Sequence, residues 1–286
     1  MLGQDLIACF ESSGLKAIGL GSREIDVTKS EQVDTIVMDL APHLVINCAA
    51  YTAVDRAESE PEAAFAVNRT GPENLANVCR RLRIPLIHMS TDYVFDGRSN
   101  RPYLEEDPVN PINVYGLSKW EGEQAVRTCL PEHLIVRTAW LYGVHGHNFV
   151  KTMLRLARER EELRVVVDQH GSPTWTGDMS TALVKMSLKV LTDLDPISWG
   201  TYHYCSAGET TWYDFARLIV EEARRTGPVK ATCIVPITSA EFPSSTSRPA
   251  YSVLDCNRIG RVFGITPRPW PLALAEMLKS FDDYGA

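Results

Sequence analysis

A tyrosine and a lysine four residues apart, Tyr115 and Lys119, are the residues whose spacing points most directly to chemistry. On a helix, side chains four residues apart lie on the same face, one turn from each other. A phenol with a pKa of about 10 is a weak acid–base group at neutral pH, but a nearby ammonium favours the phenolate, and a nicotinamide cation would add to that effect. The pair predicts a group that protonates an alkoxide as hydride arrives, or removes that proton in reverse.

The hydroxyl that would complete such a site is that of Thr91, directly after the apolar run Leu86–Met89 and its following serine. A hydroxyl at the end of a strand can hold a substrate carbonyl oxygen in place. Each feature alone also has an ordinary explanation, because Tyr and Lys often meet at this spacing by chance and a Ser-Thr pair often caps a helix. The order of strand, hydroxyl, loop and helix-opening Tyr-x-x-x-Lys favours catalysis.

The elements that must position these groups alternate along the first half of the chain. Compact apolar runs predict buried strands, and the amphipathic stretches between them predict helices. The strands are expected at Lys16–Leu20, Leu44–Ala49, Leu86–Met89 and Leu134–Thr138, and the helices at Ser30–Leu40, Asn74–Leu82 and Val114–Thr128. This α/β alternation predicts a Rossmann-type, doubly wound parallel sheet, whose ligands lie beyond the carboxyl ends of the strands.

The second half of the chain is predicted to complete the sheet and then to add a smaller, irregular α/β domain. Its expected elements are helices at Phe149–Glu159, Met179–Val190, Thr210–Arg225 and near Leu272–Phe281, with an apolar run at Leu163–Val167. Thr210 or Thr211 is expected to cap the third of these helices. We predict a dinucleotide-binding domain over 1–143, with a return segment near 163–204, and a substrate domain over about 144–162 and 205–286.

Composition and charge exclude several classes of protein. A hydrophobic content of 44% over 286 residues suffices for a core. The net charge of -7, with no basic stretch, argues against nucleic acid as a partner. No apolar run reaches the roughly 18 residues of a membrane span, and the N-terminus lacks the pattern of a signal peptide. The seven cysteines form no C-x-x-C pair and the seven histidines no H-x-x-x-H group. We therefore expect a cytoplasmic protein without a catalytic metal.

Several longer motifs resemble those of the extended short-chain dehydrogenases/reductases, and within them the dTDP-4-dehydrorhamnose reductase family. They are Asn47-Cys-Ala-Ala-Tyr-Thr-Ala-Val-Asp55, Ser90-Thr-Asp-Tyr-Val-Phe-Asp-Gly97, Asn113-Val-Tyr-Gly-Leu-Ser-Lys119, Arg137-Thr-Ala-Trp-Leu-Tyr-Gly143, Asp168-Gln-His-Gly-Ser-Pro-Thr174 and Ser247-Arg-Pro249. The resemblance implies Thr91, Tyr115 and Lys119 as the catalytic set, with Tyr115 as proton donor. It also implies that Thr91, Asp92 and Trp140 contact a sugar nucleotide, although a Trp beside a buried strand is often only core.

The cofactor turn is where this chain departs from the family pattern. The family begins with a strand and a Gly-x-x-Gly-x-x-Gly turn that cradles a pyrophosphate at a helix N-terminus. Here Leu2 and Gly3 match only the last part of that turn, and Gly3 would be the glycine that allows close helix packing. The first strand and the first two glycines are absent from the given sequence. Either the given start lies downstream of the true one, which is the simpler account, or the chain has lost part of its phosphate cradle. In the second case we expect a sheet that lacks an inner strand and binds the cofactor weakly.

Other cofactor positions follow from the resemblance. Asp26 and Val27 match an adenine contact, although Asp26 can equally be a turn residue before the Ser30–Leu40 helix. The segment Ala50-Tyr51-Thr52 would line the pyrophosphate and ribose, and Lys119 would also bind the nicotinamide ribose.

Ser22 and Arg23, after Gly21, stand where an acidic residue would normally bind the ribose 2′-hydroxyl. Without that carboxylate nothing repels a 2′-phosphate, and Arg23 could bind one, although it can also be a solvated surface charge. The sequence thus predicts NADPH as cofactor, with NADH as a further candidate.

Arg248 is the candidate for the substrate diphosphate, because a guanidinium makes two parallel bonds to phosphate oxygens; the alternative is a surface Arg that caps a helix. The sequence leaves open a divalent ion such as Mg²⁺ at a subunit contact, and a homodimer.

Together these features imply reduction of the C4 keto group of dTDP-4-dehydro-β-L-rhamnose to dTDP-L-rhamnose. Two alternatives remain. One is a non-catalytic regulatory subunit on the same fold, like that of methionine adenosyltransferase, which the shortened cofactor turn favours. The other is a nucleotide-sugar epimerase, which shares Tyr-x-x-x-Lys but retains its cofactor.

Overall fold

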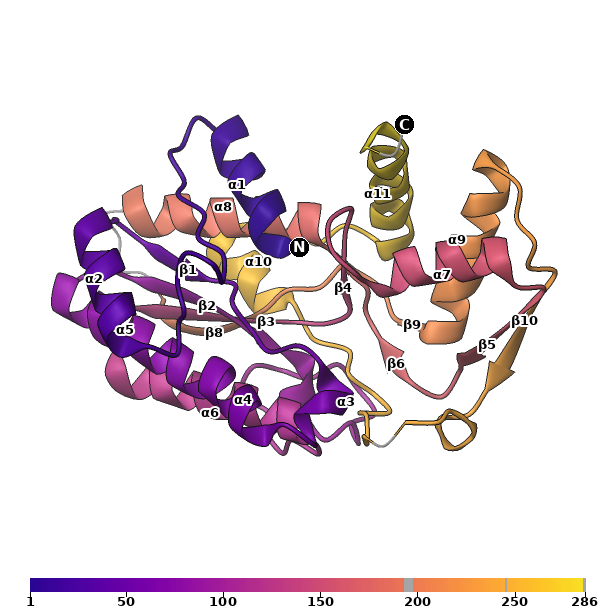
Figure 1. Cartoon of the computed structure of the whole chain (residues 1–286), viewed down its shortest axis with the longest axis horizontal. Helices are drawn as coiled ribbons and strands as arrows, with labels where there is room; N and C mark the ends of the chain where they lie inside the picture. The colour runs from indigo at the N-terminus through magenta and orange to yellow at the C-terminus, as the bar shows by residue number, and fades with distance from the viewer. Residues whose placement is uncertain (193–197, 245, 285–286) are drawn as a thin grey trace.

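The apolar runs of the first half form a parallel sheet of four strands in the order β1-β2-β3-β8 (Figure 1). The strands are β1 (Val45–Asn47), β2 (Leu86–Thr91), β3 (His133–Thr138) and β8 (Gly200–His203). Every residue of β2 and β3 is buried, as expected for strands covered on both faces. This computed structural model describes residues 1–192, 198–244 and 246–284.

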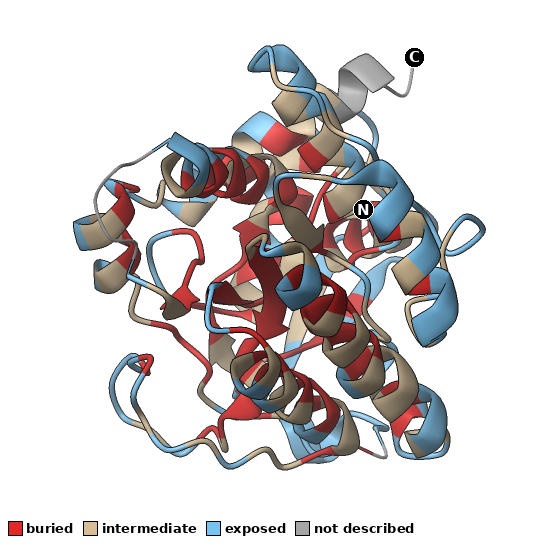
Figure 2. Ribbon diagram, turned by 90° about the vertical axis from the view of Figure 1, so that its left-hand side faces the viewer, coloured by how far each residue is buried: buried red, intermediate tan, exposed pale blue. Residues whose placement is uncertain are grey.

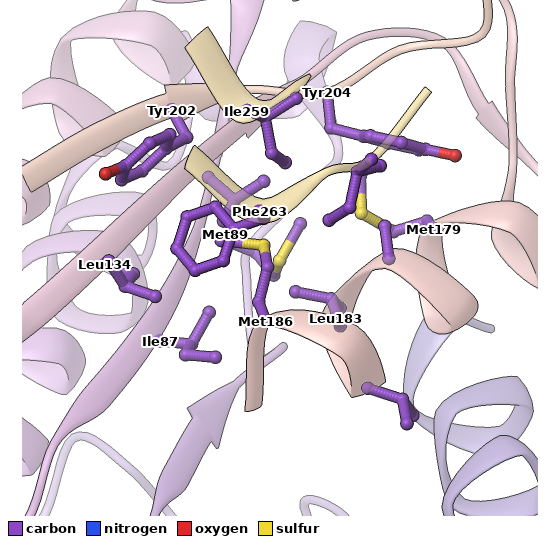
Figure 3. Close-up of a cluster of buried hydrophobic side chains, with 14 of the residues drawn as sticks. Ile87, Met89, Leu134, Met179, Leu183, Met186, Tyr202, Tyr204, Ile259 and Phe263 are labelled. Carbon is purple, nitrogen blue, oxygen red and sulfur yellow. The ribbon is translucent and has the colours of Figure 1, made fainter. Parts of the chain in front are cut away.

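Helices cover both faces of the sheet. One face carries α1 (Leu2–Ser12), α8 (Thr176–Thr192) and α10 (Asn257–Phe263), and the other carries α2 (Ser30–Leu40), α5 (Gly71–Leu82) and α6 (Val114–Cys129). Side chains alternate along β2: Ile87 and Met89 join the cluster under α8 and α10 (Figure 3), whereas Leu86 packs with Val78 and Val126 on the opposite face. Figure 2 shows the resulting buried layer between the helices.

Short elements connect the strands at the end of the sheet where the predicted site lies. After β1 the chain forms α3 (Val54–Ala57), α4 (Pro61–Phe65) and the π-helical turn η1 (Ala66–Thr70), which leads into α5. After β2 it forms the 3₁₀ turn η2 (Asp92–Val94). Such π turns often accompany functional sites.

A second hydrophobic cluster lies in the other half of the molecule (Figure 1). It is built from α7 (Phe149–Glu159), β5 (Glu162–Val166), α9 (Trp212–Thr226), β10 (Cys233–Ile237) and α11 (Trp270–Tyr284). Strands β5 and β10 pair in parallel, and the remaining short elements are β4 (Leu141–Tyr142), β6 (His170–Gly171), β7 (Thr174–Trp175), β9 (Thr210–Thr211) and η3 (Ser239–Glu241).

The expected helices and three of the four expected strands are confirmed. The predicted cap of α9 is also confirmed, because the Thr211 side chain accepts a hydrogen bond from the Asp214 backbone. The strand expected at Lys16–Leu20 is wrong: this stretch is irregular, with Ile18 and Leu20 exposed. A strand needs a hydrogen-bonding neighbour, and β1 pairs only with β2 among the described residues.

The return segment predicted near 163–204 needs a further correction. Its first part, β5, pairs with β10 and packs in the second cluster, whereas α8 and β8 lie with the main sheet. A short run of apolar residues in the sequence does not reveal which sheet the strand joins, because the main sheet and the second cluster would both bury it. The domain boundaries themselves stay a prediction.

Candidate active site

The end of β2 places Thr91 and Asp92 at the carboxyl edge of the sheet. Both residues are buried, and the Thr91 hydroxyl donates to Asp92 Oδ1 at 3.0 Å while accepting from the Tyr93 backbone at 3.2 Å. Burial raises the pKa of Asp92 to about 6, although hydrogen bonds with Ser252 and Thr91 lower it. Asp92 Oδ2 is buried with no hydrogen-bond partner among the described residues. A buried acceptor of this kind is suited to a polar group of a ligand.

Helix α6 brings Tyr115 and Lys119 to the same edge. Its first turn is capped by Asn113, whose side chain accepts from the Gly116 backbone at 2.8 Å. A Cβ at Gly116 would overlap the backbone of Tyr93, so a glycine here lets the helix approach η2 closely. The rings of Tyr93 and Tyr115 then meet edge to face, with centroids 5.4 Å apart. The structure therefore brings together Thr91, Asp92 and Tyr115.

Burial, rather than Lys119, dominates the electrostatics of the Tyr115 phenol. Burial raises the pKa of Tyr115 to about 12, against a hydrogen bond with Thr91 that lowers it. Lys119 is 2% exposed, and its Nζ donates to the Met89 carbonyl at 2.6 Å. Burial lowers the pKa of the Lys119 ammonium to about 8. The predicted stabilisation of the phenolate by Lys119 is therefore not present in the protein alone, which keeps Tyr115 protonated.

Arg248 reaches this region from a distant part of the chain. Its guanidinium donates to Asp55 Oδ2 at 2.8 Å, and Ser244 donates to Asp55 Oδ1 at 3.0 Å. Burial raises the pKa of Tyr93, whereas the positive charge of Arg248 lowers it. Arg248 Nε is buried without a partner among the described residues. Arg248 is thus held by Asp55 of α3 rather than by a helix end, and its charge reaches the Tyr93 phenol.

Trp140 follows β3 with its backbone in the left-handed region, at φ 46°. For a bulky side chain this conformation is rare and strained. The indole stacks on Trp212, the first residue of α9, with ring centroids 3.6 Å apart and an interplanar angle of 11°. Gly171 also lies against the indole, because a Cβ there would approach the Trp140 ring to 2.5 Å. Trp140 is therefore held at the junction of the two halves of the molecule.

The start of α1 lies near the carboxyl end of β1. Burial raises the pKa of Cys48 to about 12, while the positive charges of the Met1 amino group and of Lys119 lower it. No side chain caps the start of α1 at Leu2, so its first N–H groups have the character of an anion site. The packing role expected for Gly3 is wrong, because a Cβ at Gly3 would meet no atom within 4 Å.

The loop after β1 is fixed by a buried asparagine of η1. Asn68 Oδ1 accepts from the Tyr51 backbone N–H at 2.8 Å, and its amide donates to the Tyr51 carbonyl and to Ser118 Oγ, each at 3.0 Å. Ala50 and Thr52 flank Tyr51 in this loop. Asn68 therefore ties the predicted cofactor loop to α6, a role that sequence reasoning did not identify.

The turn predicted to bind adenine and the 2′-position is held by its own side chains. Asp26 Oδ1 accepts from both the backbone and the hydroxyl of Thr28, and these bonds lower the Asp26 pKa, so the turn interpretation of Asp26 holds. Val27 packs against Gly71 at the start of α5. Ser22 and Arg23 are exposed. No contact places this turn beside Tyr115 among the described residues.

The expectation that this turn carries no carboxylate is wrong. Glu24 folds back, and its Oε2 accepts from the Gly21 backbone at 2.8 Å. Glu24 directly follows Arg23, one position beyond the segment Gly21–Arg23 that matches the family's acidic position, so a position-by-position comparison of the motif does not detect it.

Within residues 1–192, 198–244 and 246–284, no group of three or more His, Cys, Asp or Glu side chains gathers in a way that could hold a metal ion. In the same described ranges, no helix combines the length and the apolar character that a membrane span requires.

Comparison with known proteins relates nearly the whole chain to one family. The family model described as "RmlD substrate binding domain" matches residues 1–283. A dTDP-4-dehydrorhamnose reductase of Aggregatibacter actinomycetemcomitans is 40% identical over 278 residues, which cover 96% of this chain and 94% of that protein.

Solved structures give the same relationship. A crystal structure of a dTDP-4-dehydrorhamnose reductase from Clostridium acetobutylicum superposes with a TM-score of 0.91 at 37% identity, covering 98% of this chain and 96% of the other. A second, from Bacillus anthracis in complex with NADP, has a TM-score of 0.89 at 37% identity and covers 98% and 95%. The Rossmann-type fold of this chain is therefore shared with these oxidoreductases.

Proposed function

The chain belongs to the RmlD substrate binding domain family, that of the dTDP-4-dehydrorhamnose reductases, and from this membership we propose that it reduces the C4 keto group of dTDP-4-dehydro-β-L-rhamnose to give dTDP-L-rhamnose. The observation that carries the assignment is that Thr91, Asp92 and Tyr115 lie together at the carboxyl edge of the parallel sheet. The fold that holds them matches that of a solved reductase over 98% of this chain. A nicotinamide cofactor, when bound, supplies the hydride.

The residues at this edge can perform the proton half of the reaction. Tyr115 stays protonated because burial raises its pKa to about 12, so it can give its proton to the oxygen of the reduced carbonyl. Thr91, which hydrogen-bonds Tyr115, is suited to hold that oxygen. Lys119, charged below its pKa of about 8, then favours the phenolate that forms. Stabilisation of the Tyr115 phenolate by Lys119 is thus assigned to the complex with substrate and cofactor during the reaction, rather than to the protein alone.

NADPH fits the residues near the start of α1. The uncapped amino end of α1, at Leu2 and Gly3, is suited to the pyrophosphate, and the loop Ala50–Thr52 to the adjoining ribose. Lys119 is close to Cys48, which follows β1. This places Lys119 at the carboxyl edge of the sheet, where a residue that binds the nicotinamide ribose would have to lie. The relative from Bacillus anthracis was solved with NADP, which supports the same cofactor here.

The preference for NADPH over NADH depends on two residues of opposite charge at the exposed turn. Arg23 would attract a 2′-phosphate, whereas Glu24 would repel it. We expect Arg23→Ala to lower kcat/KM for NADPH more than for NADH, and Glu24→Gln to do the opposite. If each variant changes kcat/KM equally for NADPH and NADH, then the turn that contains Ser22 and Arg23 is not part of the cofactor site.

The nucleotide sugar is assigned to the opposite side of the site. Arg248 is suited to its diphosphate and Asp92 to a sugar hydroxyl. Trp140, whose ring is held by Trp212, is assigned a contact with the sugar nucleotide. All seven cysteines are free thiols, which suits a reaction in the reducing cytoplasm.

The test is consumption of NADPH in the presence of dTDP-4-keto-L-rhamnose, followed at 340 nm, with Tyr115→Phe as the matched control. The proposed reductase forms dTDP-L-rhamnose and releases one oxidised cofactor in each cycle. Absence of turnover would favour a regulatory subunit, and product without release of oxidised cofactor would favour an epimerase.

A further inference from the structure

A fully buried carboxylate, Glu123, lies directly behind the catalytic groups on α6. Arg137 donates two hydrogen bonds to the Glu123 carboxylate, from Nε to Oε1 at 2.9 Å and from Nη2 to Oε2 at 2.8 Å. The Ser90 hydroxyl donates to Oε1 at 2.5 Å. Ser90 and Arg137 are register partners on β2 and β3, and each immediately precedes the last residue of its strand. The carboxylate therefore fixes α6 against the carboxyl ends of both strands.

A second arginine extends the same cluster to the edge of the sheet. Arg127 Nη2 donates to Glu123 Oε2 and to Thr201 Oγ1 of β8, each at 2.8 Å. The Arg127 guanidinium also lies 5.0 Å from the centre of the Trp120 ring, and Arg137 lies 5.9 Å from it. One carboxylate thus connects α6 to three of the four strands. Because burial raises the pKa of a carboxyl group, these cationic partners are what lower the Glu123 pKa to about 2.

The helix repeat places Glu123 on the catalytic face of α6. Tyr115, Lys119 and Glu123 follow one another at intervals of four residues, so their side chains lie along one stripe. Lys119 is buried with its Nζ on the Met89 carbonyl, and burial lowers its pKa while the charge of Glu123 raises it. Glu123 is therefore positioned both to orient the helix and to stabilise the Lys119 ammonium.

Other titratable groups also face Lys119, from the strands packed against α6. Cys48, after β1, has its pKa raised to about 12 by burial and stays a thiol near pH 8. His88 of β2 has its pKa lowered well below its usual value by burial and by Lys119, and stays neutral. Tyr115, on the same stripe, stays protonated there as well. The two arginines bound to Glu123, Arg127 and Arg137, add positive charge behind Lys119. Among all these groups, Glu123 supplies the negative charge in the pH range where Lys119 titrates.

Stability alone does not require such a cluster. A buried ion pair costs desolvation, and apolar residues of similar volume are often equally stabilising. The place of the cluster, one helical turn behind Lys119 and one residue before Thr91, points instead to the reaction.

We propose that Glu123 is a positioning residue of the reductase, which holds the Tyr115 and Lys119 face of α6 against Thr91 and keeps the Lys119 ammonium charged. The inference rests on the proposed function, because it assigns Glu123 a role in that reaction. In this role Glu123 acts through Tyr115 and Lys119 and touches neither substrate nor cofactor.

Two substitutions that change the charge of this cluster in opposite directions test the proposal: Glu123→Gln removes a negative charge, and Arg127→Gln removes a positive charge. The measurement is the pH profile of kcat/KM from pH 6 to 10 for wild type, Glu123→Gln and Arg127→Gln. Loss of the carboxylate should move the alkaline limb to lower pH by about half to one unit, since two arginines then face Lys119 uncompensated. Loss of Arg127, which is 28% exposed, should move the limb to higher pH.

The matched control is Glu121→Gln, which removes the same charge from α6 but at a side chain that is 41% exposed and paired with Arg69 on the surface. It should leave the limb in place, because solvent screens that charge. If Glu123→Gln does not fold, the upward shift in Arg127→Gln carries the test. A folding defect cannot produce shifts of opposite sign.

The outcomes separate this inference from the proposed function. No turnover by the wild-type protein would overturn the proposed function itself. Turnover with an alkaline limb that stays fixed, or that moves in the same direction in both variants, would overturn the role of Glu123.

Discussion

The guanidinium of Arg248 binds the carboxylate of Asp55 at 2.8 Å, across 193 residues of sequence. Burial would raise the pKa of Asp55, but the Arg248 hydrogen bond and charge lower it, so the pair is ionised at neutral pH. Arg248 is also the residue proposed to bind the substrate diphosphate. A diphosphate must therefore compete with Asp55 for the same guanidinium.

The Asp55→Asn variant should bind dTDP more tightly than wild type, because its neutral amide no longer competes for Arg248. An ion pair of this exposure is worth up to about 1 kcal/mol, which predicts a fall in Kd of roughly two- to fivefold by calorimetry. Glu159→Gln, which removes the surface pair with Arg155 at the same distance of 2.8 Å, should leave the Kd unchanged. Weaker binding by Asp55→Asn would instead mean that Asp55 orients Arg248 for the ligand.

Replacing Trp212 by Ala should raise KM for the nucleotide sugar roughly tenfold, with a smaller effect on kcat. The reason is that Trp140 holds a strained backbone and is stacked on Trp212 at 3.6 Å. Trp212→Phe keeps a ring and should retain most of the affinity. Steady-state kinetics check this. Similar KM values for the Ala variant and wild type would show that Trp140 needs no support from α9.

The rate of the wild-type enzyme should fall above about pH 8, where Lys119 loses its charge. Tyr115→Phe should lose at least about 100-fold in kcat across the pH range, because it removes the proton donor. The profile of kcat/KM checks the position of the alkaline limb. A limb near pH 10 in the wild-type protein would assign it to another group.

The free energy of unfolding should not depend on pH in the same way as kcat/KM. Because burial lowers the pKa of Lys119 to about 8 in the folded state, the unfolded chain binds more protons between about pH 8 and pH 10.4. The contribution of Lys119 to the free energy of unfolding therefore rises through this window. Urea titrations at pH 8 and pH 9.5, on wild type and Lys119→Met, isolate this contribution and separate loss of activity from unfolding.

Substituting Ala for Gly122 should destabilise the fold by about 1–3 kcal/mol, because a Cβ would overlap the backbone carbonyl of Asn68. This close approach of α6 to η1 also sets the bond between Asn68 and Ser118. Urea denaturation measures the change. Gly3→Ala, whose Cβ would meet nothing within 4 Å, should lose no stability. Equal stability of Gly122→Ala and wild type would mean that α6 can move away from η1.

Local pattern determined the elements and the reactive pair of this protein. Helix periodicity placed Tyr115 and Lys119 on one face of α6, and an apolar run placed Thr91 at a strand end. These relationships involve residues that are near in sequence, so the repeat of the backbone fixes them. The same repeat contained Glu123, four residues after Lys119, but spacing alone did not reveal its partners.

The tertiary structure decided what those groups experience. The pKa values of Tyr115 and Lys119 shift mainly through burial, which depends on packing by remote segments. Pairs such as Arg248 with Asp55 and Trp140 with Trp212 join distant parts of the chain, and no local periodicity encodes them. The stretch Lys16–Leu20 has the composition of a strand but pairs with no strand in the described part of the chain, because pairing is a property of the sheet rather than of the segment.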